Sequence, residues 1–267
     1  RYARKRETEW TGYKVHLTES CDEDYPHLVV NVETTPATVS DYDMTPQIHD
    51  HLADRDLLPS EHLLDGGYAS ADHLLTSQKQ GIDLLAPVSE EKSWQARAGE
   101  GFDCASFSID WEQNVATCPE GKTSQQGYTA TQKGAPVHIF KFPRSACGSC
   151  VSQPLCTKSS HGYRRIAVQP QAAYEALQAA RQRQKEEVFK QQYALRAGVE
   201  GTISQAVAVA DLRRARYVGL AKTRLQHLFT ALGMNVLRLG NWWAEIPPAK
   251  TRISPFASLA PILTAPT

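Results

Sequence analysis

Asp65 stands where an apolar segment meets two glycines, in the stretch His62-Leu-Leu-Asp65-Gly-Gly-Tyr-Ala-Ser70. The apolar residues predict a short buried strand and the glycines predict a turn, so the carboxylate falls at the carboxyl end of the strand. In open α/β sheets, ligand-binding and catalytic groups gather at that edge. The alternative is that Asp65 caps the helix that begins near Ser70 or Ala71, because Asp is a favoured capping and turn residue.

A second acidic residue, Glu200, lies near the end of a predicted helix, in the segment Tyr193-Ala-Leu-Arg196-Ala-Gly-Val-Glu200. With about 3.6 residues per turn, offsets of about 3 and 7 return to nearly the same face, so Tyr193, Arg196 and Glu200 are expected to project together. The alternative is an ordinary surface ion pair between Arg196 and Glu200. The sequence therefore allows a functional and a structural interpretation of this acidic residue.

Four cysteines lie in a segment with little apolar material, namely Cys118, Cys147, Cys150 and Cys156. The spacing Cys147-Gly-Ser-Cys150, with two further cysteines, predicts a tetrahedral zinc site of four thiolates, which would supply folding energy that the segment lacks. Four thiolates leave no open position for a catalytic water, so this zinc would be structural. Disulfides, free thiols and redox thiols are the alternatives.

Other residues near the cysteine segment give weaker signals. Cys21 and Cys104 lack partners at ligand spacing, so we expect ordinary buried or loop residues. His138 or His161 is a possible substitute for one thiolate, although a lone histidine near such a site is more often a bystander.

Charge is unevenly distributed along a chain whose formal net charge is zero. Residues 1–110 contain 9 Lys and Arg against 21 Asp and Glu, whereas residues 155–245 contain 14 against 6. The basic second part suits a phosphate backbone, and a solvated helix face is the alternative. The basic residues considered for DNA contact are Arg213, Arg214, Arg216, Lys222 and Arg224.

The chain has 267 residues with 41% hydrophobic content, which allows a real core in one large or two small domains. No apolar run approaches the roughly 20 residues that span a bilayer, and the start RYARKR lacks the apolar region of a signal peptide. We therefore expect a cytoplasmic protein with no membrane partner.

The apolar periodicity of the first part predicts the order strand, strand, helix, strand, helix, strand, in which the first two strands form a hairpin and Ser40 or Asp41 caps the first helix. These elements cover residues 10–18, 27–34, 40–58, 63–65, 70–80 and 82–87. The predicted organisation is a first core part, a cysteine-containing insertion, a helical part with Glu200 and a loose tail, at residues 1–87, 88–165, 166–245 and 246–267.

Two helices are predicted in the helical part, over residues 171–197 and 221–243. The second has apolar residues on one stripe, which we expect to pack against the core. This stripe consists of Leu225, Leu228, Phe229, Leu232, Val236 and Leu239.

Several segments, in this order, resemble the DDE transposases of insertion sequences, in particular a cysteine-containing bacterial branch. The segments are WTGYKVHLTE, LLDGGYAS, FSIDWEQNVATCPEG and RRARYVGLAKTRLQHLFTALGMNVLRL, together with the pattern Tyr193-x2-Arg196-x3-Glu200. The resemblance implies that Asp65 is the middle catalytic acid and Glu200 the last. It also implies that Tyr193 and Arg196 position a phosphate, for which a planar guanidinium is suited.

The resemblance implies an α/β fold, a ribonuclease H-like mixed sheet flanked by helices with a β-rich, zinc-stabilised insertion. That fold begins with a strand carrying the first acid, and the predicted elements lack this strand. We therefore expect the first catalytic Asp upstream of Arg1, in an N-terminally truncated copy. Asp22 and Asp24 lie in the hairpin turn, where we expect them only to be solvated.

The resemblance also implies the substrate and the cofactors. The substrate is DNA, as transposon ends and target, and the protein acts as a homodimer assembled on DNA at the nucleoid. Two Mg²⁺ or Mn²⁺ ions about 3.5–4 Å apart activate a water and neutralise the leaving oxygen, and carboxylates are suitable ligands. A first cleavage frees a 3′-OH that then attacks target DNA.

The chain departs from the family pattern at Val207, where the fuller pattern has a Lys seven residues after the Glu. Arg213 and Arg214 follow about two turns later and are candidates for some of the phosphate contact. Two other functions remain open. One is a non-catalytic transposase remnant that binds DNA or a partner, and the other is a ribonuclease H-like nuclease or resolvase without strand transfer.

Overall fold

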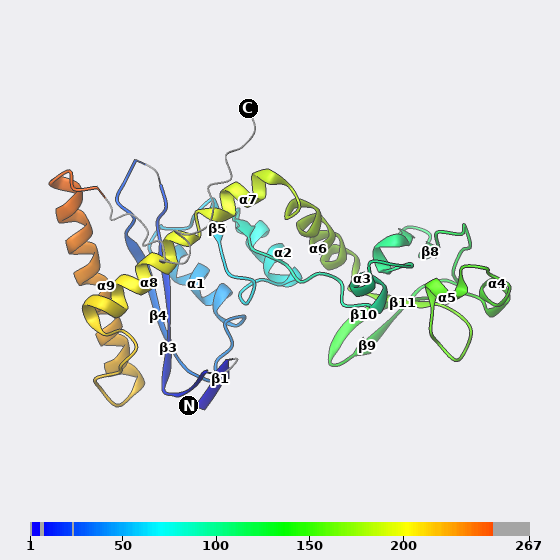
Figure 1. Ribbon diagram of the computed structural model, residues 1–267, viewed down its shortest axis with the longest axis horizontal. Helices are drawn as coiled ribbons and strands as arrows, with labels where there is room; N and C mark the ends of the chain where they lie inside the picture. Colours follow the sequence, from blue (N-terminus) through cyan, green and yellow to red (C-terminus); the bar gives the residue numbers. More distant parts are fainter. Residues whose placement is uncertain (1, 6–7, 23, 248–267) are drawn as a thin grey trace, which may run out of the picture. The chain divides into compact units, whose positions relative to one another are not determined.

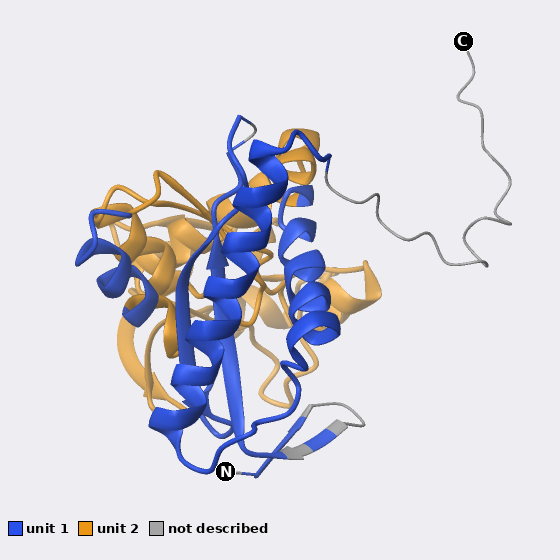
Figure 2. Ribbon diagram, turned by 90° about the vertical axis from the view of Figure 1, so that its left-hand side faces the viewer, with its two compact units in different colours: residues 1–40, 47–57, 194–267 blue, residues 41–46, 58–193 orange. Residues whose placement is uncertain are grey.

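Figure 1 shows the computed structural model of the chain, in which residues 2–5, 8–22 and 24–247 are described. The described part is a mixed α/β structure of helices and small sheets. It divides into two compact units, shown in two colours in Figure 2. Unit 1 consists of residues 1–40, 47–57 and 194–267, and unit 2 of residues 41–46 and 58–193.

Unit 1 is built on an antiparallel hairpin of β3 (Tyr13–Glu19) and β4 (Val29–Pro36). The sequence predicted this hairpin, and the structure confirms it with Leu17 opposite Val32. The predicted first strand is shorter because the chain breaks at Gly12 and the preceding residues form a separate hairpin. This hairpin consists of β1 (Tyr2–Lys5) and β2 (Thr8–Thr11).

Helices lie on both faces of the β3–β4 hairpin. Alternate β4 side chains point to opposite faces, and Glu33 accepts a hydrogen bond from His51 at 2.6 Å on the α1 side. Thr34, on the other face, hydrogen-bonds His227 of α9 at 2.8 Å. The helices of unit 1 are most of α1 (Met44–Ala53), α8 (Ala197–Ala210) and α9 (Leu220–Trp243).

Five of the six residues of the apolar stripe predicted to pack α9 against the core are exposed and Leu239 is half-buried, so that prediction is wrong. The opposite face packs, and its buried residues are Thr223, Gln226, His227, Ala231 and Met234. Specific hydrogen bonds explain this choice: Asn235 bonds both the N–H and the carbonyl of Val29, each at 2.9 Å. The leucine and phenylalanine side chains on the other face cannot make such bonds to the hairpin backbone.

Unit 2 begins with two parallel strands, β5 (Glu61–Leu63) and β6 (Asp83–Leu85), joined through α2 (Ala71–Lys79). The helix and β6 lie where the sequence predicted them, whereas β5 lies two residues before the strand predicted over 63–65. The α6 helix (Gln171–Arg183) packs on α2, and its Arg183 forms a bidentate ion pair with Asp83 at 2.6 and 2.7 Å.

The segment between β6 and α6 contains short elements around an aromatic core. Phe140 and Phe142 are almost fully buried there, and they pack with Phe107 and Ile166. The antiparallel sheet has the order β11–β10–β9. The elements are α3 (Trp94–Ala98), the 3-10 turn Cys104–Ser106, β7 (Ser108–Asp110), β8 (Val115–Thr117), β9 (Tyr128–Gln132), β10 (Ala135–Lys141), α4 (Arg144–Gly148), α5 (Gln153–Cys156) and β11 (Arg165–Val168).

Two predicted helices differ from the structure. The first, predicted over 40–58, is shorter because α1 begins just before Pro46, a residue tolerated only in the first turn. The helix predicted over 171–197 is divided into α6, α7 (Glu187–Ala194) and the start of α8. Of the predicted tail, residues 248–267 lie outside the described residues.

In the described part of the chain, every helix falls short of the length and apolar character needed to cross a bilayer.

Candidate metal and nucleic-acid sites

Asp65 lies two residues beyond the end of β5 and is exposed. Leu64 donates its N–H to Leu85 of the parallel neighbour at 2.9 Å, so the two chain segments remain side by side up to the residue before the carboxylate. The helix cap is Ser70, whose hydroxyl accepts from the N–H of His73 at 3.0 Å. The alternative that Asp65 caps this helix is therefore wrong.

Steric crowding explains why a glycine directly follows Asp65. A Cβ at Gly66 would lie 2.9 Å from the carbonyl oxygen of Pro87, so a side chain here would displace the backbone next to β6. The neighbouring Gly67 faces Asp41, with a carboxylate oxygen 3.8 Å from a built Cβ. Sequence reasoning had considered Asp41 only as a helix cap, and its position beside this loop had no signal in the sequence.

Glu200 lies in the first turn of α8, with its side chain 61% exposed. Arg196 is the N-cap residue of this helix, and its Nη1 lies 3.2 Å from Oε1 of Glu200. A carboxylate is favourable in the first turn of a helix because the unpaired N–H groups give that end a partial positive charge. The ion pair between Arg196 and Glu200, which the sequence offered as the structural alternative, is therefore present.

Tyr193 does not share a helix with Glu200. It belongs to α7 in unit 2, where its ring stacks on Phe189 with centroids 5.5 Å apart. The prediction that one helical face carries both Tyr193 and Glu200 is therefore wrong, because the helix is interrupted between α7 and α8. Gly198 and Gly201 lower the helix propensity on the far side of that break.

A buried ion pair holds α8 against β3. Arg238 of α9 lies 2.9 Å from Glu19, and their side chains are 18% and 6% exposed. Thr202 of α8 donates to the same carboxylate, and Gln205 accepts from Arg238. This network fixes the inner face of α8, so Glu200 lies on the outer one. The contact between Glu19 and Arg238 was not predicted, because residues so distant in sequence give no spacing signal.

The five basic residues considered for DNA contact are all exposed: Arg213, Arg214 and Arg216 in the α8–α9 loop, and Lys222 and Arg224 at the start of α9. Buried Gln226 shapes the loop, because it donates to the carbonyl of Arg214 and accepts from the N–H of Arg216, each at 2.9 Å. The loop backbone is thus anchored while the guanidinium groups reach solvent.

The four predicted zinc ligands line one pocket of unit 2. Cys118, Cys147, Cys150 and Cys156 surround a space of about 20 Å³, together with Phe142 and Arg164 among others. A space of this size admits about one water-sized particle. Of the two histidines considered as ligands, His138 bonds Asn114 at 2.6 Å and His161 stacks on Tyr163, and neither lines the pocket.

A backbone hydrogen bond positions the side chain of Cys118. Its Sγ accepts from the N–H of Lys122 at 3.3 Å, across a turn that Gly121 makes with a φ of +72°. Burial raises the pKa of the Cys156 thiol, and the Arg164 guanidinium opposes this rise. In the residues that the structure describes, no group of three or more His, Cys, Asp or Glu side chains is positioned to hold a metal ion.

Cys104 lies outside this pocket. Burial and the neighbouring Glu91 raise the pKa of its thiol to about 12, so it remains protonated at neutral pH. This agrees with the interpretation of Cys104 as an ordinary structural residue.

Comparison with protein families adds one finding to this geometry. Residues 117–240 match the family described as a transposase DDE domain. The match supports a DDE transposase, a family that acts on DNA by nucleotidyl transfer and in general uses divalent metal ions. It includes Glu200, Arg196 and the four pocket cysteines, whereas Asp65 lies ahead of it. Neither the curated proteins nor the solved structures gave a match.

Proposed function

We propose that this chain is the catalytic part of a DDE transposase that cuts DNA at transposon ends and joins it to target DNA with Mg²⁺ or Mn²⁺. The observation that carries the proposal is the family match over residues 117–240, because this range contains the pattern Tyr193-x2-Arg196-x3-Glu200. In the proposed function, the protein works in the bacterial cytoplasm, at the nucleoid, as a homodimer on DNA.

The strand arrangement supports a ribonuclease H-like core. Among the described strands, β3 pairs with β4 alone and β5 pairs with β6 alone, so both pairs have an unpaired edge. In a ribonuclease H-like fold, a further strand would pair with such an edge. The resemblance places the first acid on that strand, and no described strand fills this position.

In this proposal, Asp65 and Glu200 are carboxylate ligands of the divalent ions. The ions supply activation of the attacking water and neutralisation of the leaving oxygen. Asp65 comes from the end of β5 in unit 2, and Glu200 from the outer face of α8 in unit 1. Arg196 positions a phosphate beside Glu200, for which its planar guanidinium suits two parallel hydrogen bonds.

Basic side chains of unit 1 bind the phosphate backbone in this proposal. The anchored loop presents Arg213, Arg214 and Arg216, followed by Lys222 and Arg224 on α9. Val207 leaves the usual Lys position without a charge, so these residues take over that contact. Tyr193 acts from α7 as a further positioning group.

We also propose a structural zinc held by Cys118, Cys147, Cys150 and Cys156. The donor chemistry supports this, since four thiols suit zinc and all four line one pocket. The pocket borders the aromatic core of the insertion, where three of these cysteines pack. The zinc would tie the short elements α4 and α5 to the β7–β8 hairpin.

The test is metal-dependent nicking of DNA that carries the terminal repeats flanking the gene, by protein extended at its N-terminus to include the expected first acid. Asp65→Asn and Glu200→Gln should each reduce cleavage at least about 1,000-fold, because losing a ligand removes the charge stabilisation that the ions provide. Matched controls are Asp72→Asn, at an exposed acid in the first turn of α2, and Glu187→Gln. Glu187 resembles Glu200 in its first-turn position, exposure and pairing with a cation.

Retained cleavage in either ligand variant would overturn the site assignment. The alternative is a non-catalytic remnant that binds DNA or a partner. It predicts DNA binding that weakens steeply with salt, no cleavage with any divalent ion, and the same binding in Glu200→Gln.

A further inference from the structure

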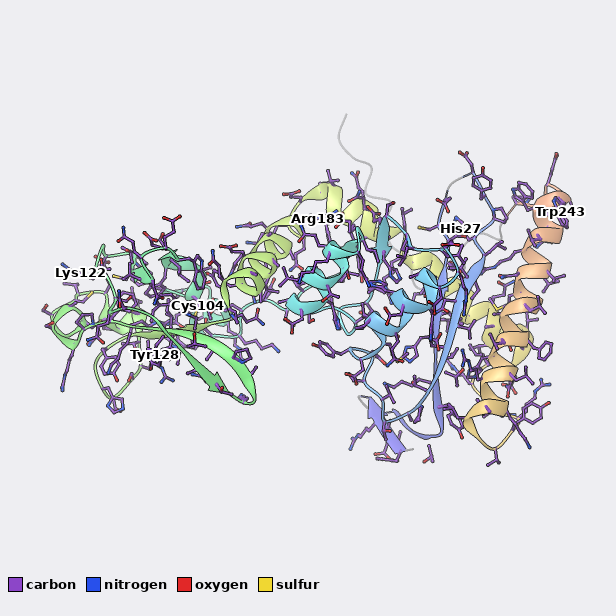
Figure 3. The ribbon with its side chains drawn as sticks, turned by 180° about the vertical axis from the view of Figure 1, so that it is seen from behind. His27, Cys104, Lys122, Tyr128, Arg183 and Trp243 are labelled. Atoms are coloured by element: carbon purple, nitrogen blue, oxygen red, sulfur yellow. The ribbon has the colours of Figure 1, made fainter. Side chains whose placement is uncertain are left out.

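The α9 helix presents an apolar stripe to solvent. This outer stripe consists of the exposed residues Leu225, Phe229, Leu232, Val236 and Trp243 and of Leu239, which is half-buried. Phe229 is 63% exposed, Val236 60% and Trp243, labelled at the end of the helix in Figure 3, 73%. Single exposed apolar residues are normal, but a contiguous patch of this kind marks an interaction site.

The spacing of the outer stripe is that of a helix-pairing seam. Successive members are separated by 4, 3, 4, 3 and 4 residues. This alternation is the heptad pattern in which two helices pack side chains of one into gaps of the other. The pattern persists over most of a 24-residue helix, so the partner surface is long and straight.

The charge pattern excludes nucleic acid and anionic membranes as the occupant. Between Leu225 and Trp243 the one Lys, Arg, Asp or Glu is Arg238, and it points inward to Glu19. Phosphate groups need cations, and interfacial membrane helices carry Lys and Arg on a polar face. An uncharged stripe brings no repulsion between two identical copies.

Two glycines beside the outer stripe give a second, independent observation. Gly233 and Gly240 are seven residues apart and exposed, and a Cβ built on either meets nothing within 4 Å. Glycine weakens a helix interior relative to alanine, and nothing in unit 1 explains its presence at these positions. Because glycine has no side chain, a second helix could approach closely at this flank.

We propose that the outer stripe of α9 pairs with the same stripe of a second copy of this chain, giving a dimer with twofold symmetry. A twofold interface needs a self-complementary surface, which an uncharged heptad seam provides. The exposed stripe and its apolar neighbours Leu228, Leu237 and Trp242 would bury on the order of 700 Å² per copy. A standard stable interface buries about 800 Å² per partner. The pairing needs neither DNA nor metal, so it is tested separately from the transposase proposal.

The experiment is sedimentation velocity of the full chain without DNA across a wide concentration range. The wild type should be a dimer at micromolar concentration. Val236→Glu should weaken dimerisation at least about 100-fold, because it buries a charge in the seam. The matched control is Val188→Glu on α7, a helical valine that is 62% exposed against 60% for Val236, and it should leave the dimer unchanged.

A rescue experiment guards against misfolded variants. Mixing Val236→Glu with Val236→Lys should restore a heterodimer, detected by native mass spectrometry, since opposite charges then meet near the middle of the seam. A mixture that stays monomeric while the wild type dimerises would place the interface elsewhere. A wild type that is monomeric at every concentration would overturn the proposal. It would favour covering of the stripe by a segment of the same polypeptide.

Discussion

The β3–β4 hairpin of unit 1 and the β9–β10–β11 sheet of unit 2 are antiparallel sheets with different means of support. The hairpin is covered by helices on both faces, and several of its buried groups anchor it to them by hydrogen bonds. Glu33 bonds His51, Thr34 bonds His227, and Val29 bonds Asn235. The three-stranded sheet instead packs one face on phenylalanines and is bordered by cysteines.

This difference indicates how each region achieves a unique structure. Long helices supply enough contact and hydrogen bonds to fix the hairpin without a ligand. In the insertion, α4 has five residues and α5 four, too few to be stable without outside support. We therefore expect folding of the insertion to depend on metal and folding of unit 1 to be independent of it.

Zinc removal should have the largest effect, and we expect it to destabilise the insertion but not unit 1. We expect native mass spectrometry of reduced, metal-replete protein to find one zinc per chain, lost in Cys147→Ser. Chelation should then expose amides of residues 117–168 to hydrogen exchange while β3 and β4 remain protected, because binding energy at such a site is folding energy. Cys104→Ser should keep the zinc, since its thiol lies outside the pocket. Finding no zinc, or equal loss of protection in β3, would refute the assignment.

Replacing Arg238 should have the next largest effect. Arg238→Met leaves the carboxylate of Glu19 buried without its partner, and such a break costs about 3–5 kcal/mol. Arg183→Met is the matched change in unit 2, where the pair with Asp83 is 36% and 48% exposed. An exposed pair contributes about 1 kcal/mol or less. Urea unfolding measures both, and equal losses would contradict the distinction between buried and exposed pairs.

The smallest effect is a pH dependence that belongs to unit 1. Burial lowers the pKa of His227 below 6.5 in the folded protein, so the unfolded chain binds more protons between the two pKa values. Stability therefore falls as the pH decreases through about 6.5 and levels off below the folded pKa. His227→Gln should show a smaller drop in melting temperature between about pH 7.5 and pH 5.5. An identical drop in both proteins would mean that other groups cause it.

Local sequence signals predicted the elements well where one signal acted alone. The β3–β4 hairpin, α2 and α9 follow from alternation and from helical periodicity. The interruption between α7 and α8 was missed because the 3.6 periodicity continues across it. The packing face of α9 was missed because hydrophobicity favoured Leu225 and Phe229, whereas hydrogen bonds from Asn235 and His227 decide the contact.

The candidate site was predictable only where its residues are neighbours in sequence. Arg196 and Glu200 are one helical turn apart, and their pairing follows from spacing. Cys147 and Cys150 likewise follow from their motif. By contrast, the support of α8 by Glu19 and Arg238 joins residues about 180 and 40 positions away from it, and no periodicity reveals such a contact.

The central claim is that Asp65 and Glu200 hold the same divalent ion, and iron-mediated cleavage tests it most directly. Fe²⁺ with ascorbate and peroxide should cut the polypeptide next to its ligands, near Asp65 and near Glu200, and excess Mg²⁺ should suppress both cuts. The account predicts that Glu200→Gln removes the cut near Asp65 and that Asp65→Asn removes the cut near Glu200. A cut that survives loss of the other carboxylate would contradict a shared ion.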